Sequence, residues 1–209
     1  ISITKGMFSD CSQLTSVTLT NGQTGIGASY SYSDSDDNYY QYTPWYLSRS
    51  NSLSLTIMDG VTHIGDLAFH ECSGLALVDM PVTLISIGDG TFFGCSSLTS
   101  IVIPNSVTSI GDMLFSYCSS LTSVVISDKL TSINNFMFWG CSNLSDVVIP
   151  DNVTSIGTMA FMDCSSLVSI IIPDNVTSIG ESTFGGCSSL TSITLPDSVT
   201  SIDDGAFYE

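Results

Sequence analysis

Cysteine is the most regularly placed reactive residue in this chain, and its thiol can form disulfides, bind metals or act as a nucleophile. Cys11 comes first, and the other six recur at an interval of 23 residues: Cys72, Cys95, Cys118, Cys141, Cys164 and Cys187. A series of single cysteines lacks the C-x-x-C spacing of zinc sites, and an odd number cannot pair completely. We therefore interpret the cysteines as buried free thiols that fill space like small apolar side chains, rather than as disulfides.

Histidine, the usual general base near neutral pH, occurs only as His63 and His70. Both fall within one repeat, and we expect both at solvent-facing turn or strand positions. The sequence contains no G-x-S-x-G, H-E-x-x-H or P-loop motif, and serine is so abundant that a serine near a histidine carries little information. We therefore predict that the protein is not an enzyme.

A possible cation site is formed by Asp34, Asp36 and Asn38, whose D-x-D-x-N spacing offers oxygen ligands to Ca²⁺. The full EF-hand pattern fails, because Tyr39 stands where glycine is required and Trp45 where the bidentate glutamate belongs. A weak loop-type calcium site is one hypothesis, and a solvated acidic loop is the alternative. We expect no other cofactor.

The cysteines belong to a longer repeated unit. A phenylalanine stands three residues before each of the six spaced cysteines, and a typical unit is FxxCSSLTSIxIPxSVTSIGxxxF. In the unit that starts at Cys95, residues 101–103 predict a short strand, residues 104–105 a turn and residues 107–110 a second extended segment. Residues 112–118 leave room for one helical or 3₁₀ turn at most.

One such unit is too small to fold alone, because ordering its backbone costs more free energy than its few apolar side chains recover by burial. Stacked units form continuous columns of equivalent side chains, with parallel strands about 4.8 Å apart. We therefore predict a β-rich solenoid of about eight rungs, with short turns or 3₁₀ segments and little α-helix. Eight strand positions follow from the register: Thr18, Thr56, Asp79, Val102, Val125, Val148, Ile171 and Thr194.

The register is interrupted once, by an insertion at residues 28–45, where the distance from Gly27 to the next aromatic position exceeds the repeat by fifteen residues. After the insertion the frame resumes, with Leu55 and Ile57 at strand positions. We interpret residues 1–209 as one solenoid domain. Because the repeats start and stop within a unit and a solenoid needs polar caps, we expect the chain to be a piece of a longer one.

Three units carry a family resemblance: CSSLTSIVIPNSVTSIG, CSNLSDVVIPDNVTSIG and CSSLVSIIIPDNVTSIG. They resemble the BspA-like leucine-rich repeats. The resemblance implies a curved, right-handed solenoid with a parallel sheet on one face, commonly on cell surfaces or secreted and often linked to adhesion. It carries over no catalytic residue. The sequence departs from the pattern at Arg49 for cysteine, Ser127 for proline and Asn134 for glycine, which affects local packing only.

The face of the strands opposite the core contains a candidate binding surface. Alternate strand residues point outward, and four consecutive rungs place an apolar residue there: Val102, Val125, Val148 and Ile171. A row of exposed apolar side chains flanked by polar residues is a plausible partner-binding surface. The alternative is that β-branched residues occur there because they favour strands.

The insertion is the second candidate binding surface, because it gathers aromatic residues beside aspartates. We select Tyr39, Tyr40, Tyr42 and Trp45 as partner-binding candidates. Loops rich in tyrosine and serine supply rigid contact area with adaptable hydrogen bonding. The alternative is that these aromatic side chains pack back onto the solenoid.

Charge limits the class of partner. The chain carries 3 Lys and Arg against 20 Asp and Glu, and Lys5, Arg49 and Lys129 lie far apart, so we exclude nucleic acid. No apolar stretch approaches the length of a membrane span, and no membrane insertion is expected. We predict an extracellular or cell-surface, non-catalytic module for adhesion or protein binding. Its ligand is expected to be a protein or another cell-surface molecule, and the negative charge of the chain favours a basic one. The alternative is an architectural segment of a filament, stalk or coat that self-associates end to end.

Overall fold

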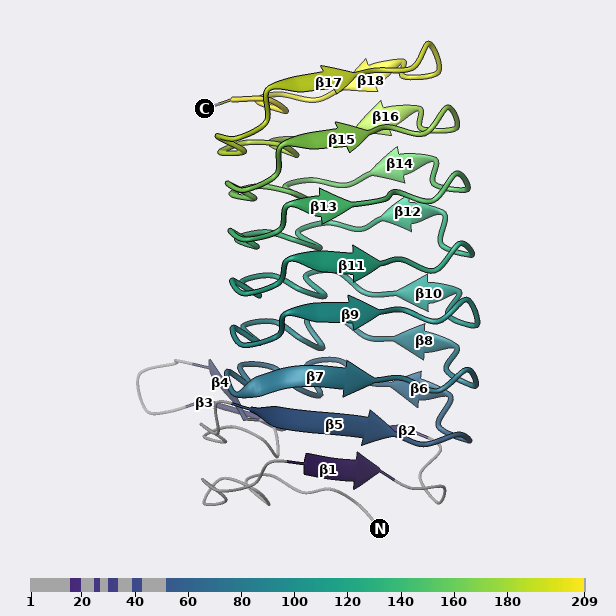
Figure 1. Cartoon of the computed structure of the whole chain (residues 1–209), viewed down its shortest axis with the longest axis vertical. Coiled ribbons are helices and arrows are strands. Elements are labelled where there is room, and N and C mark those ends of the chain that lie inside the picture. The colour runs from purple at the N-terminus through teal and green to yellow at the C-terminus, as the bar shows by residue number, and fades with distance from the viewer. Residues whose placement is uncertain (1–15, 20–24, 27–29, 34–38, 43–51, 209) are drawn as a thin grey trace.

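The computed structural model describes residues 16–19, 25–26, 30–33, 39–42 and 52–208, and in these the chain forms a parallel β-solenoid (Figure 1). One face carries the longer strands. They are β1 (Ser16–Leu19), β5 (Leu53–Ile57), β7 (Leu75–Asp79), β9 (Ser100–Val102), β11 (Ser123–Val125), β13 (Asp146–Val147), β15 (Ser169–Ile171) and β17 (Ser192–Thr194). Seven of these strands contain the residue predicted from the repeat, and the eighth predicted residue, Val148, directly follows β13.

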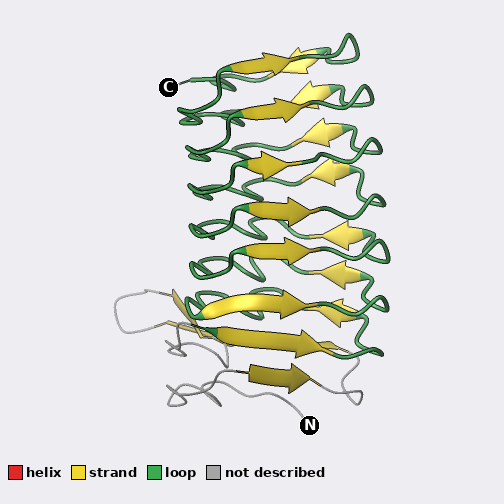
Figure 2. Ribbon diagram, viewed as in Figure 1, coloured by secondary structure: helices red, strands yellow, loops and turns green. Residues whose placement is uncertain are grey.

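The opposite side of each coil carries a shorter strand of two residues that runs in the reverse direction (Figure 2). These strands are β2 (Gly25–Ile26), β6 (His63–Ile64), β8 (Ser86–Ile87), β10 (Ser109–Ile110), β12 (Ser132–Ile133), β14 (Ser155–Ile156), β16 (Ser178–Ile179) and β18 (Ser201–Ile202). Turns connect the two sets, and none of the described residues is helical. The predicted β-rich leucine-rich-repeat solenoid is confirmed.

Strand pairing follows the repeat register. Val124 pairs with Ile101 of the rung before, one 23-residue repeat away. Across the insertion, Val17 pairs with Leu55 and Ile26 pairs with Ile64, so the offset grows by the fifteen inserted residues and the columns stay aligned. The interruption therefore leaves the register of the described strands unchanged.

The insertion contains an antiparallel hairpin of β3 (Tyr30–Ser33) and β4 (Tyr39–Tyr42), in which Tyr30 lies opposite Tyr42 and Tyr32 opposite Tyr40. The sequence-based expectation was a loop, and that expectation was wrong for these eight residues. Tyrosine has high strand propensity, and its alternation with serine in β3 has the period of a strand. The hairpin leaves the solenoid at the corner where other rungs turn from their short strand toward the next long strand (Figure 1).

The core is a ladder of stacked phenylalanine rings. Neighbouring rings lie 5.2 to 5.8 Å apart between centroids and are inclined by 4° to 18°, from Phe69 to Phe207. Leucine, isoleucine and valine columns pack around this ladder. Each ring from Phe92 to Phe184 therefore buries its faces against the rungs above and below, which no isolated rung provides.

The cysteines line the same core. All six described cysteines are buried and none of them forms a disulfide bond, which confirms that interpretation for them, whereas Cys11 lies outside the described residues. Five of the thiols donate a hydrogen bond of 3.1 to 3.3 Å to the backbone carbonyl of the phenylalanine in the preceding rung: Cys95, Cys118, Cys141, Cys164 and Cys187. The thiol thus fills space and satisfies a buried carbonyl between rungs.

Burial also changes the acidity of these thiols. Removal from water disfavours the thiolate, so burial raises the pKa of Cys95, Cys118, Cys141 and Cys164 well above the usual range. The pKa of Cys187 is raised to about 11 by the same cause. Such thiols stay neutral and unreactive in the folded chain.

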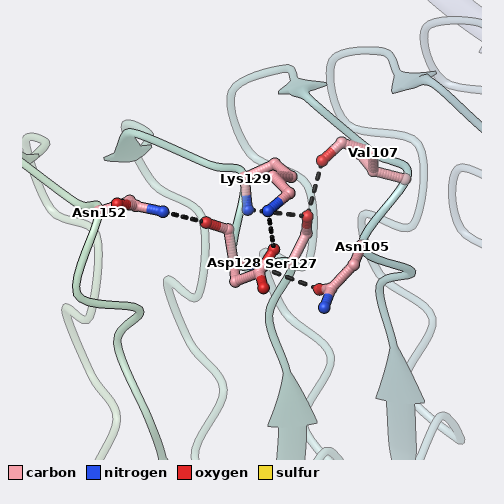
Figure 3. Close-up of polar contacts among 6 residues, drawn as sticks. All are labelled: Asn105, Val107, Ser127, Asp128, Lys129 and Asn152. Atoms are coloured by element: carbon pink, nitrogen blue, oxygen red, sulfur yellow. Dashed lines mark hydrogen bonds and ion pairs between the residues drawn. The ribbon is translucent and has the colours of Figure 1, made fainter.

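Two of the three departures from the repeat are compensated by side-chain hydrogen bonds to the neighbouring rung. Ser127 occupies the proline position, is fully buried, and donates its hydroxyl to the Val107 carbonyl at 2.7 Å (Figure 3). Asn134 occupies the glycine position and donates to the Ile110 carbonyl at 2.9 Å. Their effect is local, as expected, and Arg49 lies outside the described residues.

Truncating one ring of the ladder should destabilise the whole stack. Phe138→Ala removes a fully buried ring that stacks on Phe115 and Phe161, and we expect the free energy of unfolding to fall by about 3–5 kcal/mol. Chemical denaturation followed by circular dichroism measures this loss. Val125→Ala, on an exposed side chain, is the control and should cost less than about 1 kcal/mol. Equal losses for both variants would contradict the assigned packing.

The buried thiols predict a loss of stability in alkali. Below a pH of about 8.5 the thiols are protonated in both states, whereas above it only the unfolded chain ionises and unfolding releases protons. Each such thiol should then lower the free energy of unfolding by about 1.4 kcal/mol per pH unit. Cys141→Ser keeps a donor for the Phe115 carbonyl and removes one titrating group, so denaturation curves between pH 7 and 10 should show a shallower slope. An unchanged slope would refute the explanation.

Candidate functional site

The four apolar residues selected on the strand face are exposed, and we call them the apolar stripe: Val102, Val125, Val148 and Ile171. Their exposed fractions are 57%, 59%, 73% and 83%, whereas the inward neighbours Ile101 and Ile103 are buried. The registers of β9 with β11 and of β11 with β13 place the stripe along adjacent rungs. No described segment covers it, so the stripe faces solvent in the part of the chain that the structure describes.

The stripe has a shallow hollow between β11 and β13. This hollow has a volume of ≈ 380 Å³ and is lined by Val125, Val148 and Pro150 together with Asp128 and Asp146. Exposed Ser100, Ser123 and Ser169 continue the polar border on neighbouring rungs. The surface therefore combines an apolar floor with acidic and hydroxyl groups at its edge.

Of the candidates in the insertion, Tyr39, Tyr40 and Tyr42 lie in β4 of the hairpin. Trp45 and the proposed calcium ligands Asp34, Asp36 and Asn38 lie outside the described residues, so the calcium hypothesis stays a prediction. Within the described ranges there is no group of three or more His, Cys, Asp or Glu side chains placed to hold a metal ion.

The two histidines differ in environment. His63 is exposed in β6, as expected, and its Nδ1 lies 2.7 Å from the Thr62 hydroxyl. His70 was expected to face solvent and is instead partly buried, with its ring stacked on Phe93 at 4.7 Å between centroids. Burial lowers the pKa of His70, and the nearby Glu71 carboxylate opposes this effect only in part.

Sequence reasoning missed a cluster of aromatic side chains at one corner of the coil, which we call the aromatic corner: His70, Phe93, Tyr117, Phe136 and Trp139. Ring centroids lie 5.3 Å apart for Phe93 and Tyr117 and 4.7 Å apart for Tyr117 and Trp139. Phe136 lies 5.8 Å from Trp139. Four of these residues occupy the two variable positions of the FxxC segment, and comparing those positions between repeats would have shown the cluster.

The second variable position of FxxC has an unusual backbone. It adopts a left-handed conformation in six successive rungs, with φ between 55° and 72°, and alternates between glycine and a larger residue: Glu71, Gly94, Tyr117, Gly140, Asp163 and Gly186. A Cβ atom on Gly140 would lie 2.8 Å from Cδ1 of the Tyr117 ring, so glycine there gives the ring room to lie across the next rung. The alternation thus produces one large side chain every second rung.

Asp163 joins this corner through Trp139. The indole Nε1 donates to Oδ2 of Asp163 at 3.3 Å, which holds an exposed carboxylate next to an aromatic ring. The pKa of the Tyr117 phenol is raised, mainly by burial and to a smaller extent by the negative charge of Asp163. Aromatic faces and a carboxylate therefore meet in one place at the surface.

In the described portion of the chain there is no helix with the length and apolar character needed to cross a membrane.

Comparisons with solved structures agree with this architecture. A leucine-rich repeat protein from Eubacterium ventriosum shares 28% identity, with a TM-score of 0.72 over 85% of this chain and 49% of that one. The T. pallidum leucine-rich repeat protein shares 26% identity, with a TM-score of 0.70 over 86% of this chain and 79% of that one. A leucine rich cell surface protein from Faecalibacterium prausnitzii shares 32% identity, with a TM-score of 0.65 over 85% and 49%.

This chain thus spans about half the length of two of these three proteins. No curated protein matches it. The model of the BspA type leucine rich repeat region matches residues 1–37, 46–168 and 160–209, in six copies. These matches cover nearly all of the sequence and follow the same repeat that the strands and the phenylalanine ladder display, so the chain belongs to the BspA-type leucine-rich-repeat family.

Proposed function

We propose that this chain is a non-catalytic protein-binding module that acts at the cell surface or after secretion, in adhesion. The observation that carries the proposal is the apolar stripe. Four β-branched apolar side chains in successive rungs are more than half exposed, whereas the inward-pointing residues beside them are buried: Ile101, Val124, Val147 and Ile170. A contiguous exposed apolar surface of this sort favours contact with another protein.

The stack supports the stripe as a binding surface because it holds the side chains in fixed positions. Each stripe residue lies in or directly after a strand that pairs with at least one neighbouring rung, so little conformational freedom remains to be lost on binding. The hollow between β11 and β13 gives a partner side chain a place to insert. Anchors that fill such hollows contribute most of the affinity in many interfaces.

Charge favours a basic partner. The chain carries a formal net charge of −17, and Asp128 and Asp146 lie at the edge of the hollow. Long-range attraction of this kind raises the rate of association with cationic proteins and repels anionic ones.

The proposed location at the cell surface is supported by the family and by one neighbour. The F. prausnitzii protein is described as a leucine rich cell surface protein. BspA-type repeats form scaffolds that are typically used for protein interactions. The apolar stripe gives this chain a surface suited to the same use.

Replacing the stripe by threonine tests the proposal. Threonine keeps the β-branched shape and already occurs at the equivalent positions Thr18, Thr56 and Thr194. In the variant V102T/V125T/V148T/I171T, we expect attachment of protein-coated beads to a mammalian epithelial cell layer to fall about tenfold. The free energy of unfolding should change by no more than roughly 1 kcal/mol, because all four side chains are exposed.

A second variant separates the hairpin from the stripe. This variant replaces three tyrosines of β4 by serine: Tyr39, Tyr40 and Tyr42. It should weaken attachment if the hairpin contributes, and it should leave the thermal unfolding of the solenoid unchanged. Attachment of the threonine variant at the native level would overturn the role of the stripe.

A further inference from the structure

The rings of the aromatic corner lie outside the phenylalanine ladder and do not contribute to its stacking. The phenylalanine ladder stacks without these rings, and Tyr117 is 41% exposed on a left-handed turn. Phe93, Phe136 and Trp139 are each only partly buried. Tyr117 and Phe136 adopt positive φ angles of 59° and 57°, and a large aromatic side chain held at the surface in this strained conformation points to a functional role.

The charges around this corner are negative. Asp163 lies beside Trp139, and Glu71 lies 4.0 Å from His70 Nε2 at the other end of the row. Because burial lowers the pKa of His70, the imidazole is neutral at physiological pH and adds no positive charge. A cation that approaches the corner therefore meets carboxylates and the electron-rich faces of aromatic rings.

The chain itself supplies no cation to this corner within the described residues. Lys129 is the single described lysine or arginine. It lies in the turn after the long strand, at another position of the coil, where its Nζ is 3.2 Å from Asp128 Oδ1 (Figure 3).

We propose that the aromatic corner binds arginine side chains of a partner protein. The guanidinium stacks against Trp139 or Tyr117 and donates to the Asp163 carboxylate, which the indole hydrogen bond holds at the edge of the ring. Arginine fits better than lysine, because its planar guanidinium is weakly hydrated, stacks on aromatic faces and donates two parallel hydrogen bonds to a carboxylate.

This surface is separate from the apolar stripe. The stripe lies on the face of the long strands, whereas the corner lies in the turns before each cysteine. The Tyr-rich hairpin leaves the first rung at the equivalent corner, so it extends the same side of the molecule (Figure 1). The two proposals therefore succeed or fail independently.

Two short peptides test the inference on the full chain. A fluorescently labelled GRGRGRG peptide and its lysine counterpart GKGKGKG carry equal charge, and fluorescence polarisation at 150 mM salt measures their dissociation constants. We expect the arginine peptide to bind at least fivefold more tightly. Equal affinities would show that only the general acidity of the chain attracts the peptides, and would overturn the proposal.

Three variants assign the binding to the corner. Trp139→Ser and Tyr117→Asn should each remove most of the preference for arginine, and Asp163→Asn should weaken the arginine peptide about tenfold. Asparagine tolerates the left-handed backbone at residues 117 and 163. Asp151→Asn, at an exposed turn elsewhere, removes the same charge and is the matched control.

Two results would contradict the proposal that the aromatic corner binds arginine. If Asp151→Asn weakens the arginine peptide as much as Asp163→Asn does, or if Trp139→Ser and Tyr117→Asn keep the arginine preference while melting like the native chain, the corner is not the binding site. Because either aromatic variant suffices, a failure of one of them to fold leaves the test intact.

Discussion

Contact between rungs is the interaction on which this structure depends. A single coil of 23 residues buries few side chains against itself, and its phenylalanine ring has both faces exposed until a second and third coil cover them. Stacking buries the rings, pairs the strands in parallel and provides five of the thiols with a carbonyl acceptor one rung away. The side chains that point inward are therefore constrained by the repeat, and those that point outward are free to differ.

That division explains where the candidate sites lie. The apolar stripe occupies the outward positions of the long strands, and the aromatic corner occupies the variable positions between phenylalanine and cysteine. In both places the rigid stack spaces the side chains at the interval between rungs and holds them before a partner arrives. The scaffold needs no pocket or catalytic group to bind proteins, only a row of suitable side chains on a fixed frame.

The repeat made much of the fold predictable. The regular interval of Cys72 to Cys187 and the aligned phenylalanines sufficed to place all eight long strands, the interruption and the outward stripe. The hairpin was missed because tyrosine, serine and aspartate were treated as loop residues, although Tyr30 and Tyr32 alternate as in a strand. The aromatic corner was missed because the left-handed backbone at Tyr117 directs its ring toward Trp139, and the spacing of residues in the sequence does not show this conformation.

Native-state hydrogen exchange tests the central claim most directly, because it compares the rungs within one folded chain. If stability comes from contact between rungs, the amides of Ile156 and Ile179, each in a strand that pairs on both sides, should exchange slowest. The amide of Ile202, in the terminal strand β18, should exchange fastest among these equivalents. Equal protection in all three would mean that each rung is stable by itself, and would contradict the account.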